Sequence, residues 1–245
     1  MAKYDPKSSD PAEFINNEEI LETIDYGRAN AHNRALIIDI LEKAKKAKGL
    51  SHKEAFVLLS CAEDDLNKEI LKTAKELKLK FYANRIVLFA PLYLSNYCVN
   101  GCTYCPYHGQ NKHIPRKKLT QDEIREQVIA LQDMGHKRLA LETGEDPINN
   151  PIEYILESID TIYNIHHKNG SIRRVNVNIA ATTIENYKKL HDAEIGTYIL
   201  FQETYNKEKY ENLHAYGPKS DYDYHTTAHD RAMEGGIDDL GLGVL

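Results

Sequence analysis

The chain has 245 residues, of which 42% are hydrophobic and 28% are charged, so it can bury a sizeable core and is not expected to be disordered as a whole. Its formal net charge of -6 argues against a general nucleic-acid binder, which needs a basic surface. No apolar run approaches the roughly 18 residues of a membrane span, and the polar N-terminus lacks a secretory signal, so we expect a cytoplasmic protein without membrane or nucleic-acid partners.

The chain starts with a polar segment that is followed by helical patterning. Residues 1–17 are polar and contain Pro6 and Pro11, and we expect them to form a flexible arm. Apolar residues then recur at helical spacing, and Ser51 with Glu54 forms a capping box ahead of one such segment. Residues 18–84 are therefore predicted to form an N-terminal helical region.

From residue 85 onward, short apolar runs alternate with helical segments. Thr120 and Glu123 form a second capping box, and Thr183 is a candidate cap for a later helix. Repeated βα units predict an α/β fold with a parallel sheet and right-handed crossovers. The predicted strands are 86–90, 137–143, 174–180, 197–201 and 240–245, and a helix is expected over 224–234.

Both a doubly wound sheet and a barrel satisfy this pattern. A (β/α)₈ barrel takes about 250 residues, so residues 85–245 have room for about five βα units of a partial TIM-type barrel. The sequence ends within an apolar strand that would remain an unpaired edge. We therefore expect a chain that is cut short and that lacks a C-terminal half or a partner chain.

Three of the four cysteines are close together and point to metal chemistry. Cys98, Cys102 and Cys105 have the spacing C-x₃-C-x₂-C and follow the first predicted strand, in a βα loop at the end of the sheet where barrel active sites lie. Thiolates are the ligands of iron–sulfur clusters. Three ligands on a four-iron cube would leave one iron open. The spacing therefore favours a [4Fe–4S] cluster.

Other interpretations of these cysteines stay open at this point. They could be buried free thiols, or they could bind zinc with His108 or His113 as a fourth ligand. A non-catalytic iron–sulfur scaffold or electron carrier would also explain the spacing. The remaining cysteine, Cys61, is expected to be a small core residue of a helix.

The cysteine motif and its flanking segments resemble a known family. The motif is the signature of radical S-adenosylmethionine (SAM) enzymes with a βα barrel. Within that family the chain is most similar to tyrosine lyases of the [FeFe]-hydrogenase maturation type, with the 2-iminoacetate synthases of thiamine biosynthesis as close relatives. The segments that carry the resemblance are 88–105, 134–147, 173–183 and 198–205.

The resemblance implies a role for each of several residues. It assigns the [4Fe–4S] cluster to Cys98, Cys102 and Cys105, and it places the Tyr104 ring beside the adenine of SAM. The remaining contacts with SAM or substrate are assigned to Gly144, Glu145 and Asp146 (methionine amino group), Glu203 (methionine moiety), Arg231 (methionine carboxylate), and Asn176 and Asn178 (cofactor or substrate).

The activity that the resemblance implies is radical cleavage of an amino acid. Reduction of the cluster by a ferredoxin or flavodoxin would split SAM into methionine and a 5′-deoxyadenosyl radical, and L-tyrosine would be cleaved at Cα–Cβ into p-cresol and dehydroglycine. Maturation lyases also carry a second cluster on C-terminal cysteines. No cysteine follows Cys105 here, so we expect an incomplete form of such an enzyme.

Overall fold

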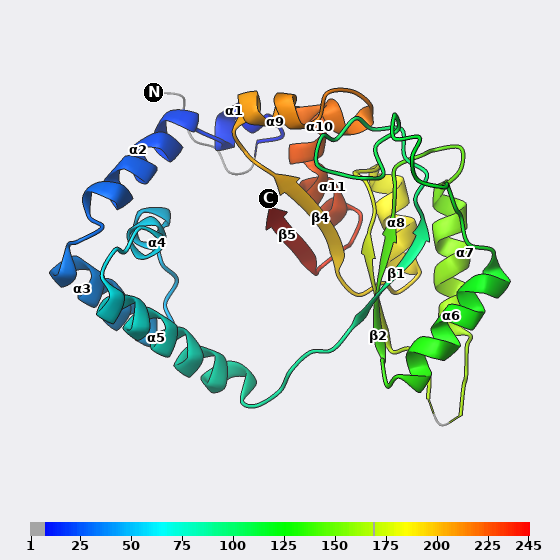
Figure 1. Cartoon of the computed structure of the whole chain (residues 1–245), viewed down its shortest axis with the longest axis horizontal. Coiled ribbons are helices and arrows are strands. Elements are labelled where there is room, and N and C mark those ends of the chain that lie inside the picture. Colours follow the sequence, from blue (N-terminus) through cyan, green and yellow to red (C-terminus); the bar gives the residue numbers. More distant parts are fainter. Residues whose placement is uncertain (1–7, 169) are drawn as a thin grey trace. The chain divides into compact units, whose positions relative to one another are not determined.

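The computed structural model describes residues 8–168 and 170–245, which form two compact units (Figure 1). The helical unit spans Ile15–Val87, and the sheet unit comprises Leu88–Leu245 together with the segment that ends at Phe14. Part of the predicted flexible arm is helical, since Pro11–Phe14 forms α1. The first seven residues of that predicted arm lie outside the described residues.

The helical unit has a small core of its own. Ser51 and Glu54 form the predicted capping box, in which each side chain bonds to the other residue's backbone N–H. The helices are α2 (Asn17–Ala29), α3 (Arg34–Lys45), α4 (His52–Leu59) and α5 (Asp64–Tyr82). Their buried apolar residues are Ile37, Ile40, Leu41, Val57 and Leu66.

The sheet unit is built on five parallel strands in the order β1-β2-β3-β4-β5. The strands are β1 (Ala90–Ser95), β2 (Arg138–Thr143), β3 (Arg174–Asn178), β4 (Tyr198–Glu203) and β5 (Leu240–Val244). A doubly wound sheet would reverse its strand order at a switch point. Sequential order with right-handed crossovers instead places every crossover helix on the same face, as in a barrel. The predicted partial TIM-type barrel is therefore confirmed.

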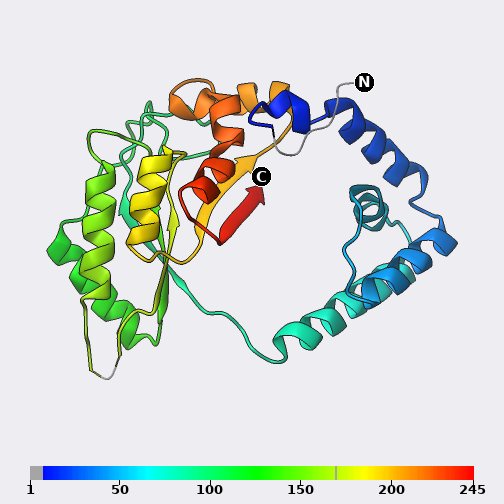
Figure 2. The ribbon, with the colours of Figure 1, turned by 180° about the vertical axis from the view of Figure 1, so that it is seen from behind.

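The helices that follow the strands cover one face of this sheet (Figures 1 and 2). Thr120 and Glu123 cap α6 as predicted, and the Thr183 side chain caps α8. The predicted helix over 224–234 is in fact two short helices, because Thr227 ends one and begins the next. The elements are α6 (Gln121–Asp133), α7 (Ile152–Tyr163), α8 (Ile184–Asp192), α9 (Lys207–Leu213), the 3₁₀ helix η1 (Pro218–Ser220), α10 (Tyr222–Thr226) and α11 (Ala228–Glu234).

The predicted first strand, 86–90, is wrong: β1 begins four residues later and ends five residues later, at Ser95. Its first residue, Ala90, pairs with Leu139, the second residue of β2, so in this register residues 86–88 lie beyond the start of β2 and have no neighbour in it. Residues 86–89 are apolar but exposed. β3 ends at Asn178, two residues before the predicted end, and β4 continues two residues past its predicted end, to Glu203.

The two faces of the sheet differ in chemistry. The face under the helices carries alternate apolar residues, such as Leu139 and Leu141 of β2, which pack against α6, α7 and α8 in the main core. On the opposite face, Glu142 of β2 is in register with Tyr93 of β1 and with Asn178 of β3. That second face, called the inner face below, therefore has a polar row near the carboxyl ends of the strands.

No helix among the described residues is long and apolar enough to cross a membrane.

The main core makes a direct prediction about stability. Ile159 on α7 is 1% exposed, and Ile159→Ala should lower the free energy of unfolding by about 3 kcal/mol because it leaves a cavity. The matched change Ile148→Ala, at a side chain 88% exposed, should leave it nearly unchanged. Urea unfolding followed by far-UV circular dichroism measures both; equal effects would contradict this packing.

Candidate active site

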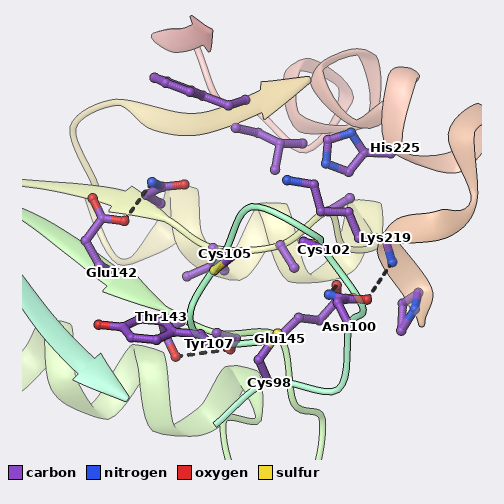
Figure 3. A pocket seen from close by; sticks show the side chains of 18 of the residues that line it. Cys98, Asn100, Cys102, Cys105, Tyr107, Glu142, Thr143, Glu145, Lys219 and His225 are labelled. Carbon is purple, nitrogen blue, oxygen red and sulfur yellow. Dashed lines mark hydrogen bonds between the residues drawn. The ribbon is translucent and has the colours of Figure 1, made fainter. Parts of the chain in front are cut away.

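The three motif cysteines line one cavity at the carboxyl ends of the strands (Figure 3). The cavity has a volume of about 280 Å³ and lies wholly within the sheet unit. Of the residues predicted for cofactor binding, it is also lined by Tyr104, Gly144, Glu145, Asn178 and Glu203. The fold therefore brings together most of the predicted site from four separate βα loops and strand ends.

The loop that carries the cysteines is hydrogen-bonded on two sides. On one side, Val99 N donates to Glu145 O at 2.8 Å. On the other, Gly101 N donates to Tyr216 O and Thr103 N to Leu213 O, both at 2.9 Å. These bonds fix the backbone of the loop between the end of β2 and the segment that follows α9.

Two glycines permit this close packing. A Cβ atom on Gly144 would lie 2.3 Å from the carbonyl oxygen of Tyr97, and one on Gly101 would lie 2.3 Å from the Tyr216 ring. Any larger residue would push the cysteine loop away from its neighbours. Asn150 adds a further link, because its Nδ2 donates to the carbonyl oxygens of Tyr97 at 2.9 Å and Gly144 at 2.8 Å.

A buried network surrounds the Tyr104 hydroxyl. Tyr104 Oη donates to Glu203 Oε1 at 3.1 Å, and Lys219 Nζ donates to Tyr104 Oη at 3.1 Å and to Glu203 Oε1 at 3.3 Å. Oη also lies 3.1 Å from His214 Nε2. Burial lowers the pKa of His214 to about 4, with Lys219 adding to the effect, so the imidazole is neutral at physiological pH. The pKa of Tyr104 is raised by burial and by the nearby Cys102 and Glu203.

Glu203 occupies an unusual backbone conformation at the end of β4. Its φ is 67°, and the register with β5 shifts between Phe201 and Glu203. A non-glycine residue in this region is strained and is typically found where a side chain has a function. The Glu203 side chain is 9% exposed and depends on Lys219 for its countercharge.

Two further carboxylates line the cavity. Asn100 Nδ2 donates to Glu145 Oε2 at 2.6 Å, and burial raises the pKa of Glu145 in spite of that bond. Asn178 Nδ2 donates to Glu142 Oε2 at 2.7 Å, and burial raises the pKa of Glu142 to about 7. Burial likewise raises the pKa of the Cys102 thiol, while the charge of Lys219 opposes it.

Three residues predicted to bind the cofactor have other partners in the structure, and none of them lines the cavity. The Asp146 carboxylate accepts hydrogen bonds from the backbone of Ile148 and Asn149, so it stabilises its own loop. Asn176 Oδ1 accepts from Thr197 N and from Arg174 Nε. For these two residues the predicted roles remain predictions without structural support.

Arg231 is the third of these residues. Its guanidinium donates to the carbonyl oxygens of Thr182 and Tyr224 and to Thr227 Oγ1, and it lies 3.8 Å from the centre of the Tyr224 ring. The Tyr224 ring itself lines the cavity. Arg231 therefore supports the cavity wall in this structure, and its contact with a carboxylate remains a prediction.

The donor set suits an iron–sulfur cube better than a single zinc ion. A cube presents a separate iron to each thiolate, whereas zinc needs all of its ligands around one ion. Within the described part of the chain, no three His, Cys, Asp or Glu side chains are grouped to hold one metal ion. Neither His108 nor His113 lines the cavity with the cysteines.

Several residues of the site were not predicted from the sequence. Asn100 lies between two motif cysteines, so its position was a usable signal. No sequence signal indicated a role for Lys219, Asn150 or His214, because each reaches the cysteine loop from a distant part of the chain.

The buried ion pair makes the next prediction. Lys219→Met removes the countercharge of Glu203 and should lower the free energy of unfolding by about 3 kcal/mol, since the two side chains are only 18% and 9% exposed. Lys189→Met is the matched control, because Lys189 pairs with Glu153 at the surface and the change should have little effect. Urea unfolding compares the two variants, and equal losses would contradict a buried role for Lys219.

The chain resembles characterised proteins in both sequence and structure. The family model of the radical SAM superfamily matches residues 92–245. The 2-iminoacetate synthase of Salmonella typhimurium strain LT2 is 32% identical over 205 residues, which are 84% of this chain and 52% of that protein. The chain spans about half the length of the curated relatives it matches.

Two solved structures are closely similar in fold. The crystal structure of HydG, a maturase of the [FeFe]-hydrogenase, has a TM-score of 0.91 and 56% identity, over 96% of this chain and 51% of that one. HydG from Carboxydothermus hydrogenoformans has a TM-score of 0.81 and 37% identity, over 94% of this chain and 54% of that one. The predicted cofactors, a [4Fe–4S] cluster and SAM, are those of the matched family. The resemblance predicted from the cysteine motif is thus confirmed, and the chain belongs to the radical SAM superfamily.

Proposed function

We propose that this protein is a radical SAM carbon–carbon lyase that cleaves L-tyrosine at Cα–Cβ, giving p-cresol and dehydroglycine, in the maturation of [FeFe]-hydrogenase. The observation that carries the proposal is the cavity shared by Cys98, Cys102 and Cys105 with Glu145 and Glu203. The 56% identity to HydG over nearly the whole chain favours the maturation type.

Different residues of the cavity would hold the two cofactors. Cys98, Cys102 and Cys105 would hold the cluster, and the Gly144–Glu145 segment and Glu203 would receive the methionine part of SAM. When bound, the two cofactors supply a 5′-deoxyadenosyl radical. Lys219 and Tyr104 fix the Glu203 carboxylate before any ligand arrives, so little reorganisation is needed on binding.

Apolar side chains of the same cavity would protect the reaction from water. Ile179, Leu200 and Phe201 line it beside the polar groups. A closed site matters for this chemistry because dissolved oxygen and other solutes would consume a carbon radical in an open one. In this proposal a cytoplasmic ferredoxin or flavodoxin supplies the electron, and L-tyrosine is the small-molecule substrate.

A second function, that of a 2-iminoacetate synthase in thiamine biosynthesis, is supported by the similarity to the Salmonella typhimurium enzyme. Both functions begin with the same cleavage of tyrosine. They differ in the fate of dehydroglycine, which a maturase converts to carbon monoxide and cyanide. Release of carbon monoxide in addition to p-cresol would favour the maturase, whereas p-cresol with glyoxylate and no carbon monoxide would favour the synthase.

The cluster assignment is tested by replacing single cysteines. Cys98→Ala, Cys102→Ala and Cys105→Ala should each abolish the cubane electron paramagnetic resonance signal of the anaerobically reconstituted, reduced protein and lower 5′-deoxyadenosine formation at least about 100-fold. Cys61→Ala is the matched control and should change neither. A cluster that persists without the motif thiols would refute the assignment. A normal cluster without 5′-deoxyadenosine would identify an electron carrier instead.

The substrate assignment has a separate test. The reconstituted, reduced protein with SAM should convert L-tyrosine to p-cresol, measured by liquid chromatography, and should not release phenylpropanoid acids such as p-coumarate. 5′-Deoxyadenosine without p-cresol would leave the family assignment intact and refute tyrosine as the substrate.

A further inference from the structure

The three carboxylates that line the cavity differ in their partners. Glu203 pairs with Lys219, and Glu145 accepts from Asn100, which itself lies in the cysteine loop. Glu142 accepts from the neutral amide of Asn178 at Oε2, and the described residues provide no hydrogen bond to its Oε1. Glu142 is therefore the carboxylate of the cavity that has neither a cation nor a hydrogen bond to the cysteine loop.

The geometry points to Glu142 as the binding group for the α-ammonium of an amino-acid substrate, with Asn178 holding its carboxylate in place. This inference rests on the proposed function, which supplies the amino acid. It adds a residue that was not among those predicted from the sequence.

The position of Glu142 on the sheet supports this role. Its side chain lies on the inner face, in register with Tyr93 of β1 and Asn178 of β3. In Figure 3, Glu142 lies on the opposite side of the cavity from Lys219 and His225. A substrate bound at Glu142 would therefore occupy the part of the cavity that the Lys219–Glu203 pair does not use.

The charges around the cavity explain why a cation would bind there. Among the described residues that line it, Lys219 is the one cation at neutral pH, and its charge is already paired with Glu203. Burial lowers the pKa of His225 to about 3, so that imidazole is neutral. The remaining titratable groups that line the cavity are the thiols of the three cysteines, several phenols and the Glu145 carboxyl, and none of these groups is a cation.

A partly buried carboxylate without a cation is destabilised, and an ammonium group would relieve this. Burial raises the pKa of Glu142 to about 7, although the bond from Asn178 acts in the opposite direction. A charge-assisted hydrogen bond from an ammonium donor to Oε1 would favour the ionised carboxylate and hold the amine at one fixed point. Fixing the amine in turn orients the Cα–Cβ bond of the substrate in the cavity.

The test compares L-tyrosine with one ligand that lacks the amino group and one that lacks the carboxylate. Protein reconstituted with cluster and SAM but kept without reductant cannot turn over, so equilibrium dialysis measures binding alone. The probes are L-tyrosine, its analogue without the amine, 3-(4-hydroxyphenyl)propionate, and tyramine, which lacks the carboxylate. The wild-type protein should bind L-tyrosine at least about 10-fold more tightly than the analogue without the amine, as expected for a charge-assisted bond.

In Glu142→Gln, this preference should fall to less than about 3-fold, with weaker binding of tyramine and unchanged binding of the propionate. The substitution keeps the size of the side chain and an oxygen for Asn178. Glu142→Asp, which keeps the charge, should retain part of the preference. Glu185→Gln, at an exposed glutamate of α8, should retain all of it. Iron and sulfide contents of each variant are measured first.

An unchanged preference for L-tyrosine in Glu142→Gln would overturn the inference. Weaker binding of both L-tyrosine and the propionate, with tyramine unchanged, would also overturn it, because that result would place Glu142 on the substrate carboxylate. The proposed function fails on a different result. If the wild-type protein makes no p-cresol while its amine preference still depends on Glu142, the tyrosine lyase is refuted and the amine subsite stands.

Discussion

Close backbone packing around the cysteine loop is the constraint on which the rest of the site depends. The three thiols come from a loop, so their spacing is set by what holds its backbone. Gly144 allows the end of β2 to approach Tyr97, and Gly101 allows the Tyr216 ring to cover the loop from the other side. Hydrogen bonds from Val99, Gly101 and Thr103 then tie the loop to both neighbours. The position of the sulfurs is thus a property of three chain segments that are distant in sequence.

The charges of the cavity are arranged around this loop in two groups. Lys219, Glu203 and Tyr104 form a bonded set whose charges are balanced before a ligand binds. Glu142 and Asn178 form a second set on the inner face of the sheet. This pair has a carboxylate but no cation. Under the proposed function the cavity holds a nucleoside cofactor and an amino acid, and two sets with different electrostatics suit two such ligands. The neutral histidines His214 and His225 add hydrogen-bonding groups without adding charge.

The sequence predicted the parallel α/β architecture because apolar periodicity reports burial against neighbouring elements. The sequence-based prediction placed the first strand too early because residues 86–89 are apolar although they are exposed and form no strand pairs. Strand pairing depends on where β2 begins, which the apolar pattern of residues 86–89 does not report. The grouping of the three cysteines in one cavity was predictable because they are close together in the sequence. Lys219 and Glu142 were not, since their roles depend on partners from other strands and loops. Arg231 was assigned to a ligand, yet its guanidinium is satisfied by Thr182, Thr227 and Tyr224, which only the fold brings near it.

The strained backbone at Glu203 connects the fold to the chemistry. A positive φ at a non-glycine residue costs about 1–3 kcal/mol, so the surrounding structure must compensate. Here the carboxylate receives bonds from Lys219 and Tyr104, and the Glu203 carbonyl accepts from Leu245 N at 2.9 Å, next to the irregular register with β5. The ladder with β5 skips Gln202 and resumes at Glu203, which pairs with Val244. The Glu203 carboxylate is buried and lies beside the hydroxyl of Tyr104, two residues after Cys102 in the sequence. The strained residue therefore carries the carboxylate that Lys219 and Tyr104 hold beside the cysteine loop.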